Sequence, residues 1–390
     1  MRADPPPDSG LVRDLVRIGR SLAGDSCPPG DPCVLSGRAD GLVVRIDDVV
    51  VKAHAHETDP QDLRTRLKLA ASPQLRSALL SPLAIPPPRA PLPWRPAPPD
   101  NMPSGGAQLG TALEDAQAGL ALEVRGRLIT AWPAGVPVSP DDPDAAPWEE
   151  AATLLARLHA TALAAVAPAG RLPHAGAPGR VARAMARLRA AGRTPAGIAV
   201  EEAFARLAPP ASGGTAAPPD GSGAGGARWR GERSDVLVHG DFHLGQVVRL
   251  PDARTAGDTM AGAPERREAP PGDPGGPGAG GFRLIDIDDL GVGDPAWDLA
   301  RPAALYAAGL LPPEAWWRFL SAYRAAGGCA VPAEGDPWPA LDAAARALAV
   351  QSAALAVAAA SRDGRPLDEV ETALVDTCRR MVRVGAPPML

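Results

Sequence analysis

The sequence predicts an α+β protein with a small antiparallel sheet followed by a larger, mainly helical region. Short apolar segments of the strand type gather between residues 34 and 132. Beyond Gly135, apolar residues recur at helical spacing instead. No internal repeat interrupts this order. We therefore expect two lobes, residues 1–135 and 136–390, joined near residues 132–136.

The first lobe is expected to begin with an amphipathic helix over residues 9–23. Five strands follow in the prediction, at 34–37, 42–46, 49–53, 120–124 and 128–132. Asp47-Asp48 joins the second strand to the third. Between the third and fourth strands, Asp59 as N-cap and Pro60 as first helical residue begin a helix that runs to about residue 71. A Pro-rich stretch at 84–106 is read as a non-regular insertion.

The second lobe is expected to contain a helix over 147–163 and, near the C-terminus, further helices near 295–309, 312–326, 338–361 and 366–384. Its strands are expected at 236–240, 247–250 and 282–287. Residues 207–234 and 251–281 are low in complexity and rich in Gly and Pro. We interpret the second of these segments as an overgrown loop of a hairpin.

Composition narrows the class of protein. The chain of 390 residues carries a net charge of −5 and no block of Lys and Arg, so we expect no nucleic-acid partner. Its four cysteines form neither a disulfide framework nor a zinc pattern, which is typical of a reducing compartment. The first residues lack a secretory pattern, and the longest apolar run, about 347–360, is too short to span a bilayer. We expect a cytoplasmic protein with no membrane partner; its oligomeric state is left open.

The densest polar patterns are V-H-G-D-F-H-L-G-Q at 238–246 and L-I-D-I-D-D-L-G-V-G-D-P-A-W-D-L-A at 284–300. Both begin on apolar strands and break at Gly, so their acids are expected in loops at strand ends. Asp286 and Asp288, two apart on a strand, would share a face. Carboxylates of this kind, with Asp241 and the amide oxygen of Gln246, are hard ligands suited to magnesium.

Two other interpretations stay open at this point. Acids in loops of this kind are often turn formers or helix caps, as Asp289 and Asp294 would be. Alternatively, the cluster of His239, Asp241, His243 and Asp286 could hold zinc or manganese in a metal-dependent hydrolase.

The two motifs, H-G-D-F-H-x-G-Q and I-D-x-D-D-x-G-x-G-D-P-x-x-D-L-A, together resemble the aminoglycoside phosphotransferase and choline kinase-like family. The L-G-Q ending is most similar to the maltokinase branch. The resemblance covers roughly residues 40–390 without the insertions. It implies a two-lobed, protein-kinase-like fold with an N-terminal lobe that binds nucleotide and a C-terminal lobe for catalysis and substrate binding.

The resemblance also implies roles for single residues of the second lobe. Asp241 matches the catalytic aspartate, which orients the substrate hydroxyl and accepts its proton. The implied magnesium ligands are Gln246 and Asp286, with Asp288 assisting. The implied scaffold groups are His239 and Asp298, the latter bonding the backbone of the catalytic loop.

In the first lobe, the resemblance assigns Lys52 to the lysine that grips the α- and β-phosphates. Lys52 is one of only two lysines among 40 basic residues. Gly37 lies in the S-G-R-A-D-G stretch at 36–41, where the phosphate-covering loop should be. The hinge that meets the adenine would include Ala131 and Trp132. The family's glutamate partner of the lysine is missing from the following helix, so Glu57 or Asp62 would take that role.

These assignments predict a kinase that uses ATP and Mg²⁺ to phosphorylate a hydroxyl of a small-molecule acceptor, namely a sugar, an aminoglycoside or an amino alcohol. A catalytically weak, nucleotide-binding relative and the metal-dependent hydrolase are the alternatives. Acids of the last helix could attract a cationic acceptor or form an ordinary solvated face: Asp368, Glu369, Glu371 and Asp376.

Overall fold

The computed structural model describes residues 9–23, 31–38, 41–86, 119–139, 142, 145–166, 172–207, 236–251 and 281–384. The chain divides into two units. The N-terminal unit comprises residues 2–68 and 81–134, and the C-terminal unit comprises residues 69–80 and 135–390. Most of the three insertions inferred from composition, at 84–106, 207–234 and 251–281, lies outside the described residues.

The N-terminal unit is built on a five-stranded antiparallel sheet with strand order β1-β2-β3-β5-β4. Its strands are β1 (Cys33–Arg38), β2 (Gly41–Ile46), β3 (Val49–His54), β4 (Leu122–Val124) and β5 (Arg127–Pro133). The expected hairpin between β2 and β3 turns at Asp47-Asp48 and pairs Ile46 with Val49. The five strands predicted for this part of the chain are therefore present.

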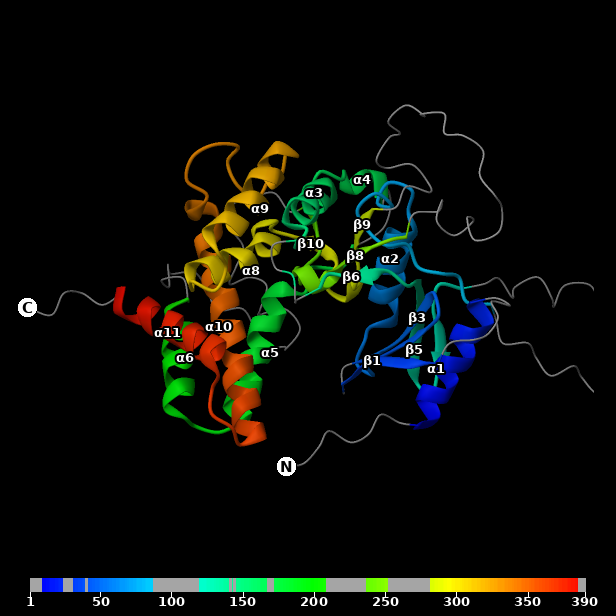
Figure 1. Cartoon of the computed structure of the whole chain (residues 1–390), viewed down its shortest axis with the longest axis horizontal. Helices are drawn as coiled ribbons and strands as arrows, with labels where there is room; N and C mark the ends of the chain where they lie inside the picture. The colour runs from blue at the N-terminus through cyan, green and yellow to red at the C-terminus, as the bar shows by residue number, and fades with distance from the viewer. Residues whose placement is uncertain are drawn as a thin grey trace, which may run out of the picture. The chain divides into compact units, whose positions relative to one another are not determined.

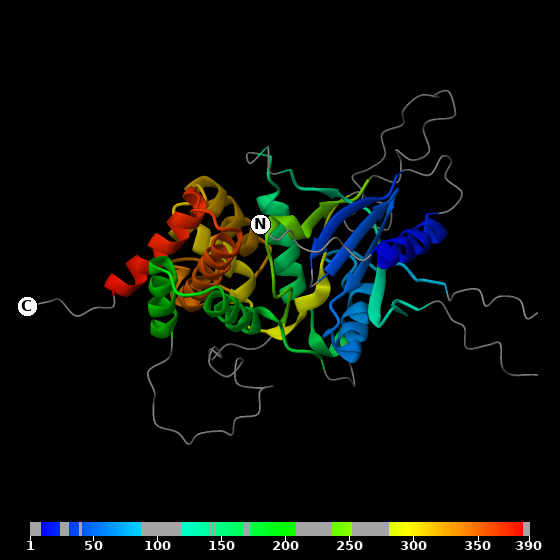
Figure 2. The same ribbon diagram turned by 90° about the horizontal axis from the view of Figure 1, so that it is seen from below.

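One face of this sheet is covered by helix α1 (Ser9–Leu22), as Figures 1 and 2 show. Leu11 and Leu15 of α1 pack with Val51 and Ala131 of the sheet in one buried apolar cluster. Because side chains alternate along a strand, Lys52 points to the opposite face from its buried neighbour Val51. The amphipathic pattern predicted for residues 9–23 thus places the apolar face of α1 against the sheet.

Helix α2 (Pro60–Ala71) begins where the sequence predicts. The carboxylate of Asp59 accepts hydrogen bonds from the backbone N–H groups of Gln61 at 2.8 Å and Asp62 at 2.9 Å. This satisfies two of the amide groups that the first helical turn leaves without an intrahelical partner. Pro60 needs no such partner, because it has no N–H.

The C-terminal unit contains two small antiparallel sheets. One pairs β7 (Val236–Val238) with β10 (Gly291–Gly293), and the other has the order β6-β8-β9. The strands of the second sheet are β6 (Val136–Pro137), β8 (Val247–Arg249) and β9 (Phe282–Leu284). Pairing of β8 with β9 confirms the expected hairpin. The strands predicted over 236–240 and 282–287 are wrong at their ends, because the backbone turns after Val238 and after Leu284.

Helices form most of the other described residues of this unit, and the long helix α10 lies among them (Figure 1). They are α3 (Trp148–His159), α4 (Leu163–Val166), α5 (Ala177–Ala190), α6 (Pro195–Arg206), α8 (Ala296–Ala307), α9 (Pro313–Ala325), α10 (Trp338–Asp363) and α11 (Glu369–Val384). Apolar side chains of α5, α6, α10 and α11 meet in one core cluster, which includes Leu188, Val200, Val357 and Val375. The sequence did not predict α5 and α6. The arrangement confirms the α+β class.

Helix α10 is longer than the apolar run that the sequence analysis recognised. With 26 residues it is the one helix in the described ranges that is long and apolar enough to cross a membrane, but 61% of its most apolar window is buried inside the fold. It packs against α5, α6, α8 and α11. Its apolar composition is therefore explained by its place in the core of the C-terminal unit.

Candidate active site

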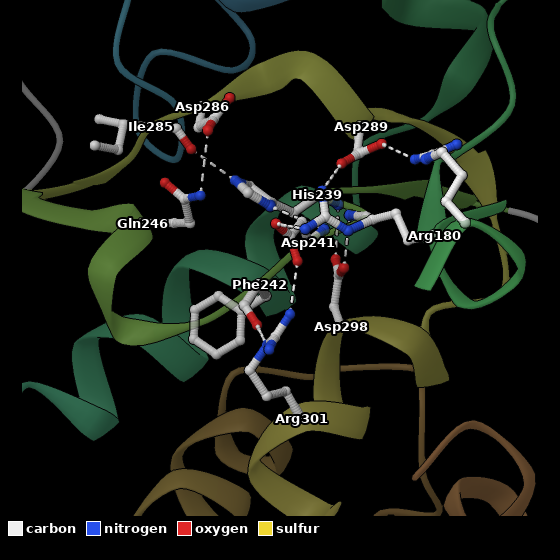
Figure 3. Close-up of polar contacts among 12 residues, drawn as sticks. Arg180, His239, Asp241, Phe242, Gln246, Ile285, Asp286, Asp289, Asp298 and Arg301 are labelled. Carbon is white, nitrogen blue, oxygen red and sulfur yellow. Dashed lines mark hydrogen bonds and ion pairs between the residues drawn. The ribbon is translucent and has the colours of Figure 1, made fainter. Parts of the chain in front are cut away.

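The first motif forms a loop over residues 239–246 that begins where β7 ends. Gly240 has φ +84°, a conformation that side chains disfavour, and a Cβ there would collide with the backbone oxygen of Asp289. The glycine of the H-G-D pattern is therefore required by both backbone conformation and space. The tight turn directs the carboxylate of Asp241 away from the strand, into the region drawn in Figure 3.

Asp298, in the first turn of α8, holds this loop. Its carboxylate accepts hydrogen bonds from the backbone N–H groups of His239 at 2.7 Å and Gly240 at 2.8 Å. Asp298 is fully buried, which by itself would raise its pKa. The hydrogen bond and charge of His159, together with the bond from Gly240, outweigh burial and hold the pKa below its usual value. The structure thus gives Asp298 the contact with the loop backbone that the resemblance implies.

Behind Asp298 lies a buried hydrogen-bond chain that the sequence analysis missed. Nε2 of His159, on α3, donates to Asp298 at 2.9 Å, and its Nδ1 lies 2.7 Å from the hydroxyl of Tyr323 on α9. That hydroxyl also accepts the N–H of Ala330 at 2.9 Å. Because an ionised carboxylate can only accept, the Nε2–H of His159 donates to Asp298. His159 is therefore more than the packed or capping histidine that its helical position suggests.

The ring of His239 links the two acidic motifs. Its Nε2 donates to the carbonyl of Ile285 at 2.8 Å, and its Nδ1 accepts the N–H of Asp241 at 3.4 Å. Ile285 directly precedes Asp286. One histidine ring therefore ties the loop that carries Asp241 to the strand end that carries Asp286 (Figure 3).

Gln246 and Asp286 meet at this junction. Nε2 of Gln246 lies 3.3 Å from a carboxylate oxygen of Asp286. Asp286 adopts the left-handed conformation, with φ 62° and ψ 78°, which is uncommon for a residue with a side chain and is concentrated at functional sites. The turn begins a short 3₁₀ helix, η2 (Ile287–Asp289). The expectation that Asp286 and Asp288 share one face of a strand is therefore wrong.

Two arginines flank the carboxylate of Asp241. Arg180, on α5, contacts one oxygen at 2.7 Å, and Arg301, on α8, contacts the other at 2.7 Å. Arg180 also bonds Asp289 at 2.6 Å. Burial raises the pKa of Asp289 above its usual value, although Arg180 opposes the shift. The sequence analysis singled out neither arginine. One signal was present: Arg301 follows Asp298 by three residues and so shares its face of α8.

The geometry disfavours the hydrolase interpretation. Both ring nitrogens of His239 are engaged in hydrogen bonds within the protein. Within the described ranges, no group of three or more His, Cys, Asp or Glu side chains is arranged to hold a metal ion. The residues that the structure describes at this place therefore offer no histidine-rich set of ligands for a transition metal.

The residues predicted to bind nucleotide lie in the N-terminal unit. Lys52 is on the central strand β3, opposite Val43 of β2 and Thr130 of β5. Gly37 is in β1 and pairs with Leu42, whereas residues 39 and 40 of the same stretch lie outside the described residues. Ala131 and Trp132, which the resemblance assigns to the hinge, belong to β5, and the carbonyl of Ala131 accepts the N–H of Leu83 at 2.8 Å.

The acids of the last helix are spread along α11 and its N-terminal approach. Glu371 pairs with Arg365 at 2.7 Å, and Asp376 pairs with Arg379 at 2.7 Å. This is the behaviour of a solvated helix face. Two tryptophans of the C-terminal unit have different surroundings. Trp297 lines a pocket beside Asp241, whereas Trp316 is fully buried and stacked on Tyr306.

No protein-family model matches the chain, and no curated protein matches it by sequence. Solved structures do match. A thermostable mutant of aminoglycoside phosphotransferase APH(4)-Ia is 12% identical, with a TM-score of 0.50 over 95% of this chain and 99% of that one. The chain therefore has the same fold as this aminoglycoside phosphotransferase.

Two other structures are similar to this phosphotransferase fold over nearly their whole length. A choline/ethanolamine kinase family protein from Mesorhizobium loti is 15% identical, with a TM-score of 0.43 over 97% of this chain and 95% of that one. Macrolide 2'-phosphotransferase MphH from Brachybacterium faecium is 16% identical, with a TM-score of 0.41 over 97% and 99%. The match to the aminoglycoside phosphotransferase confirms the predicted protein-kinase-like fold class, whereas the likeness to the maltokinase branch stays a prediction.

Proposed function

We propose that the protein is a phosphotransferase that transfers the γ-phosphate of ATP to a hydroxyl of a small molecule, with Mg²⁺. The observation that carries this proposal is the junction at His239. It joins the loop of Asp241 to the strand end of Asp286, beside Gln246, within a phosphotransferase fold.

The reaction needs a base and a position for the acceptor. Asp241 would accept the proton of the acceptor hydroxyl as that oxygen forms a bond to the γ-phosphorus. The bond from the γ-phosphorus to the bridging oxygen then breaks, and ADP leaves with the electron pair. Because Asp298 and His239 fix the loop backbone, the carboxylate keeps its orientation through the reaction. In the N-terminal unit, Lys52 is the proposed contact for the phosphates.

The oxygen atoms of Asp286 and Gln246 are suitable ligands for magnesium. Asp286 supplies a carboxylate, and a half-turn of the Gln246 amide would place its oxygen next to that carboxylate. Mg²⁺ is commonly held by one or two protein oxygens together with substrate phosphates and water. Bound there, the ion would neutralise charge on the phosphates. We assign Asp288 to an assisting position on the same turn.

Thermal stabilisation by nucleotide tests the proposal. We expect ATP to raise the melting temperature only with Mg²⁺ present, and Asp286→Asn to remove most of the magnesium-dependent part. Asp342→Asn, at an exposed position on α10, is the matched control and should behave like the native protein. Stabilisation by Zn²⁺ alone, with no response to ATP, would contradict the kinase and revive the hydrolase.

A further inference from the structure

The C-terminal unit contains a small pocket directly beside Asp241. Its walls come from α5, the loop 239–246, α8 and α10, and its empty space is about 220 Å³, part of it open to solvent. The lining side chains that matter here are Arg180, Asp241, Trp297, Arg301, Leu348 and Gln351. The enclosed part has room for little more than one water-sized group, so it can hold one small polar group of a ligand whose remainder lies in the open part.

Two guanidinium groups and the carboxylate of Asp241 form much of the polar side of the pocket. Arg180 and Arg301 each bring a guanidinium group to an oxygen of Asp241. Nε of Arg180 is buried and has no hydrogen-bond partner among the described residues. A buried donor without a partner carries a desolvation cost that no hydrogen bond offsets. An oxygen anion that entered the pocket could satisfy this donor and share the charge of both guanidinium groups.

Gln351 adds a further polar side chain to the lining of the pocket. It lies on α10, where its neighbours in sequence are mostly Ala, Val and Leu, and its side chain is only 2% exposed. Its Oε1 is buried and has no hydrogen-bond partner in the described part of the chain. An apolar residue of similar size would avoid this cost, so the amide at this place is best explained by a ligand that donates to it.

We propose that this pocket binds the acceptor, and that the acceptor is a small hydroxyl compound carrying a carboxylate or phosphate group. Arg180 and Arg301 recognise the anionic group, and Gln351 accepts a hydrogen bond from a hydroxyl. The inference rests on the proposed function, because it takes Asp241 as the base. It disfavours polycationic aminoglycosides, whose ammonium groups would face two guanidinium groups.

The proposed anionic class of the acceptor can be tested with sets of similar compounds that carry an acidic, a neutral or an amine group. One set is glycerate, glycerol and 2-amino-1,3-propanediol; a second is gluconate, glucose and glucosamine. ATP consumption and the thermal shift with ADP and Mg²⁺ are measured for each compound. We expect the acid of at least one set to exceed its neutral and amine counterparts by about tenfold or more in kcat/KM, as a charge-assisted hydrogen bond would give.

Two variants link that preference to the pocket. Arg301→Gln keeps a planar polar group without the charge, so the acid-to-neutral ratio should fall toward one. Arg318→Gln, an exposed arginine on α9 paired with Glu149, is the matched control and should keep the native ratio. Gln351→Leu should raise the KM for the acceptor about tenfold, with an unchanged KM for ATP and an unchanged or higher melting temperature.

The outcomes separate this inference from the proposed function. Turnover that favours the neutral or amine compound in both sets overturns the inference and supports the phosphotransferase. An unchanged ratio in Arg301→Gln, or a large loss of stability in Gln351→Leu, also overturns it. The inference is also overturned if ADP raises the melting temperature but neither glycerate nor gluconate changes the thermal shift or the consumption of ATP. If no nucleotide stabilises the protein and no acceptor stimulates ATP consumption, the proposed function fails as well.

Discussion

At the scale of single residues, the site depends on acids whose side chains are held by several partners each. The carboxylate of Asp298 accepts three hydrogen bonds, from two backbone amides and from His159. Asp241 is flanked by two guanidinium groups, and Asp286 meets Gln246 from a left-handed backbone. Such a degree of constraint is what positions a reacting group within tenths of an ångström.

His243 gives a prediction about pH. In the unfolded chain its pKa is near 6.5, whereas burial and the charge of Arg301 lower it to about 4 in the folded protein. The unfolded state therefore binds more protons between these values, and the free energy of unfolding should decrease as the pH falls from about 6.5 to 4. Urea unfolding across this range measures the slope.

His243→Gln should flatten that slope, whereas His56→Gln, at an exposed position in the N-terminal unit, should leave it unchanged. A slope that survives in His243→Gln would show that other groups cause the loss of stability in acid.

At the scale of elements, loop 239–246 is supported from behind by helices that are remote in sequence. The chain Tyr323–His159–Asp298 joins α9, α3 and α8 to the loop backbone. Because every member is buried, removing one hydroxyl leaves polar partners without a hydrogen bond.

Tyr323→Phe should therefore lower the free energy of unfolding by about 1–3 kcal/mol. It should also lower kcat more than it raises the KM for ATP, because the loop loses its fixed position. Tyr306→Phe is the matched control: that hydroxyl has no hydrogen-bond partner among the described residues, and its ring stacks on Trp316. Equal stability of the two variants, measured by urea unfolding, would contradict the role of the buried chain.

The hairpin of β8 and β9 offers a second prediction about an element. Its strands pair Arg249 with Phe282, and Leu250 donates to the carbonyl of Gly281 at 3.0 Å, so the two ends lie side by side. Replacing residues 252–280 by a four-residue turn should keep the fold and raise stability by about 1–2 kcal/mol, because a shorter loop costs less closure entropy. Loss of the cooperative unfolding transition would contradict this expectation.

At the scale of the whole molecule, much could be predicted from the sequence because the informative residues are close together in it. The H-G-D motif and the I-D-x-D-D motif each lie at the end of one strand. The residue types and the spacing within each motif could therefore be recognised in the sequence. Alternation and helical periodicity gave most elements, including the capped start of α2 at Asp59. The exact strand ends were not readable, since the left-handed turn at Asp286 is decided by tertiary contacts.

Other parts of the site could not be predicted for a different physical reason. Arg301 and Asp241 are 60 residues apart, and His159 and Asp298 are 139 apart. Only packing of α3, α5 and α8 around the loop brings such groups together. With 40 basic residues and only two lysines, no single arginine stood out. Helices α5 and α6 were missed because their segments mix alanine with Gly, Pro and Arg, which weakens the apolar pattern.

Asp241→Asn is the most direct test of the central claim that Asp241 is the base of a phosphotransferase. The substitution keeps the shape of the side chain and removes its capacity to take a proton. The rate of acceptor-dependent ATP consumption should fall at least about 100-fold, the contribution expected of a positioned base, while the affinity for ATP with Mg²⁺ stays within about twofold of the native value. An Asp241→Asn protein that consumes ATP at the native rate would contradict the account.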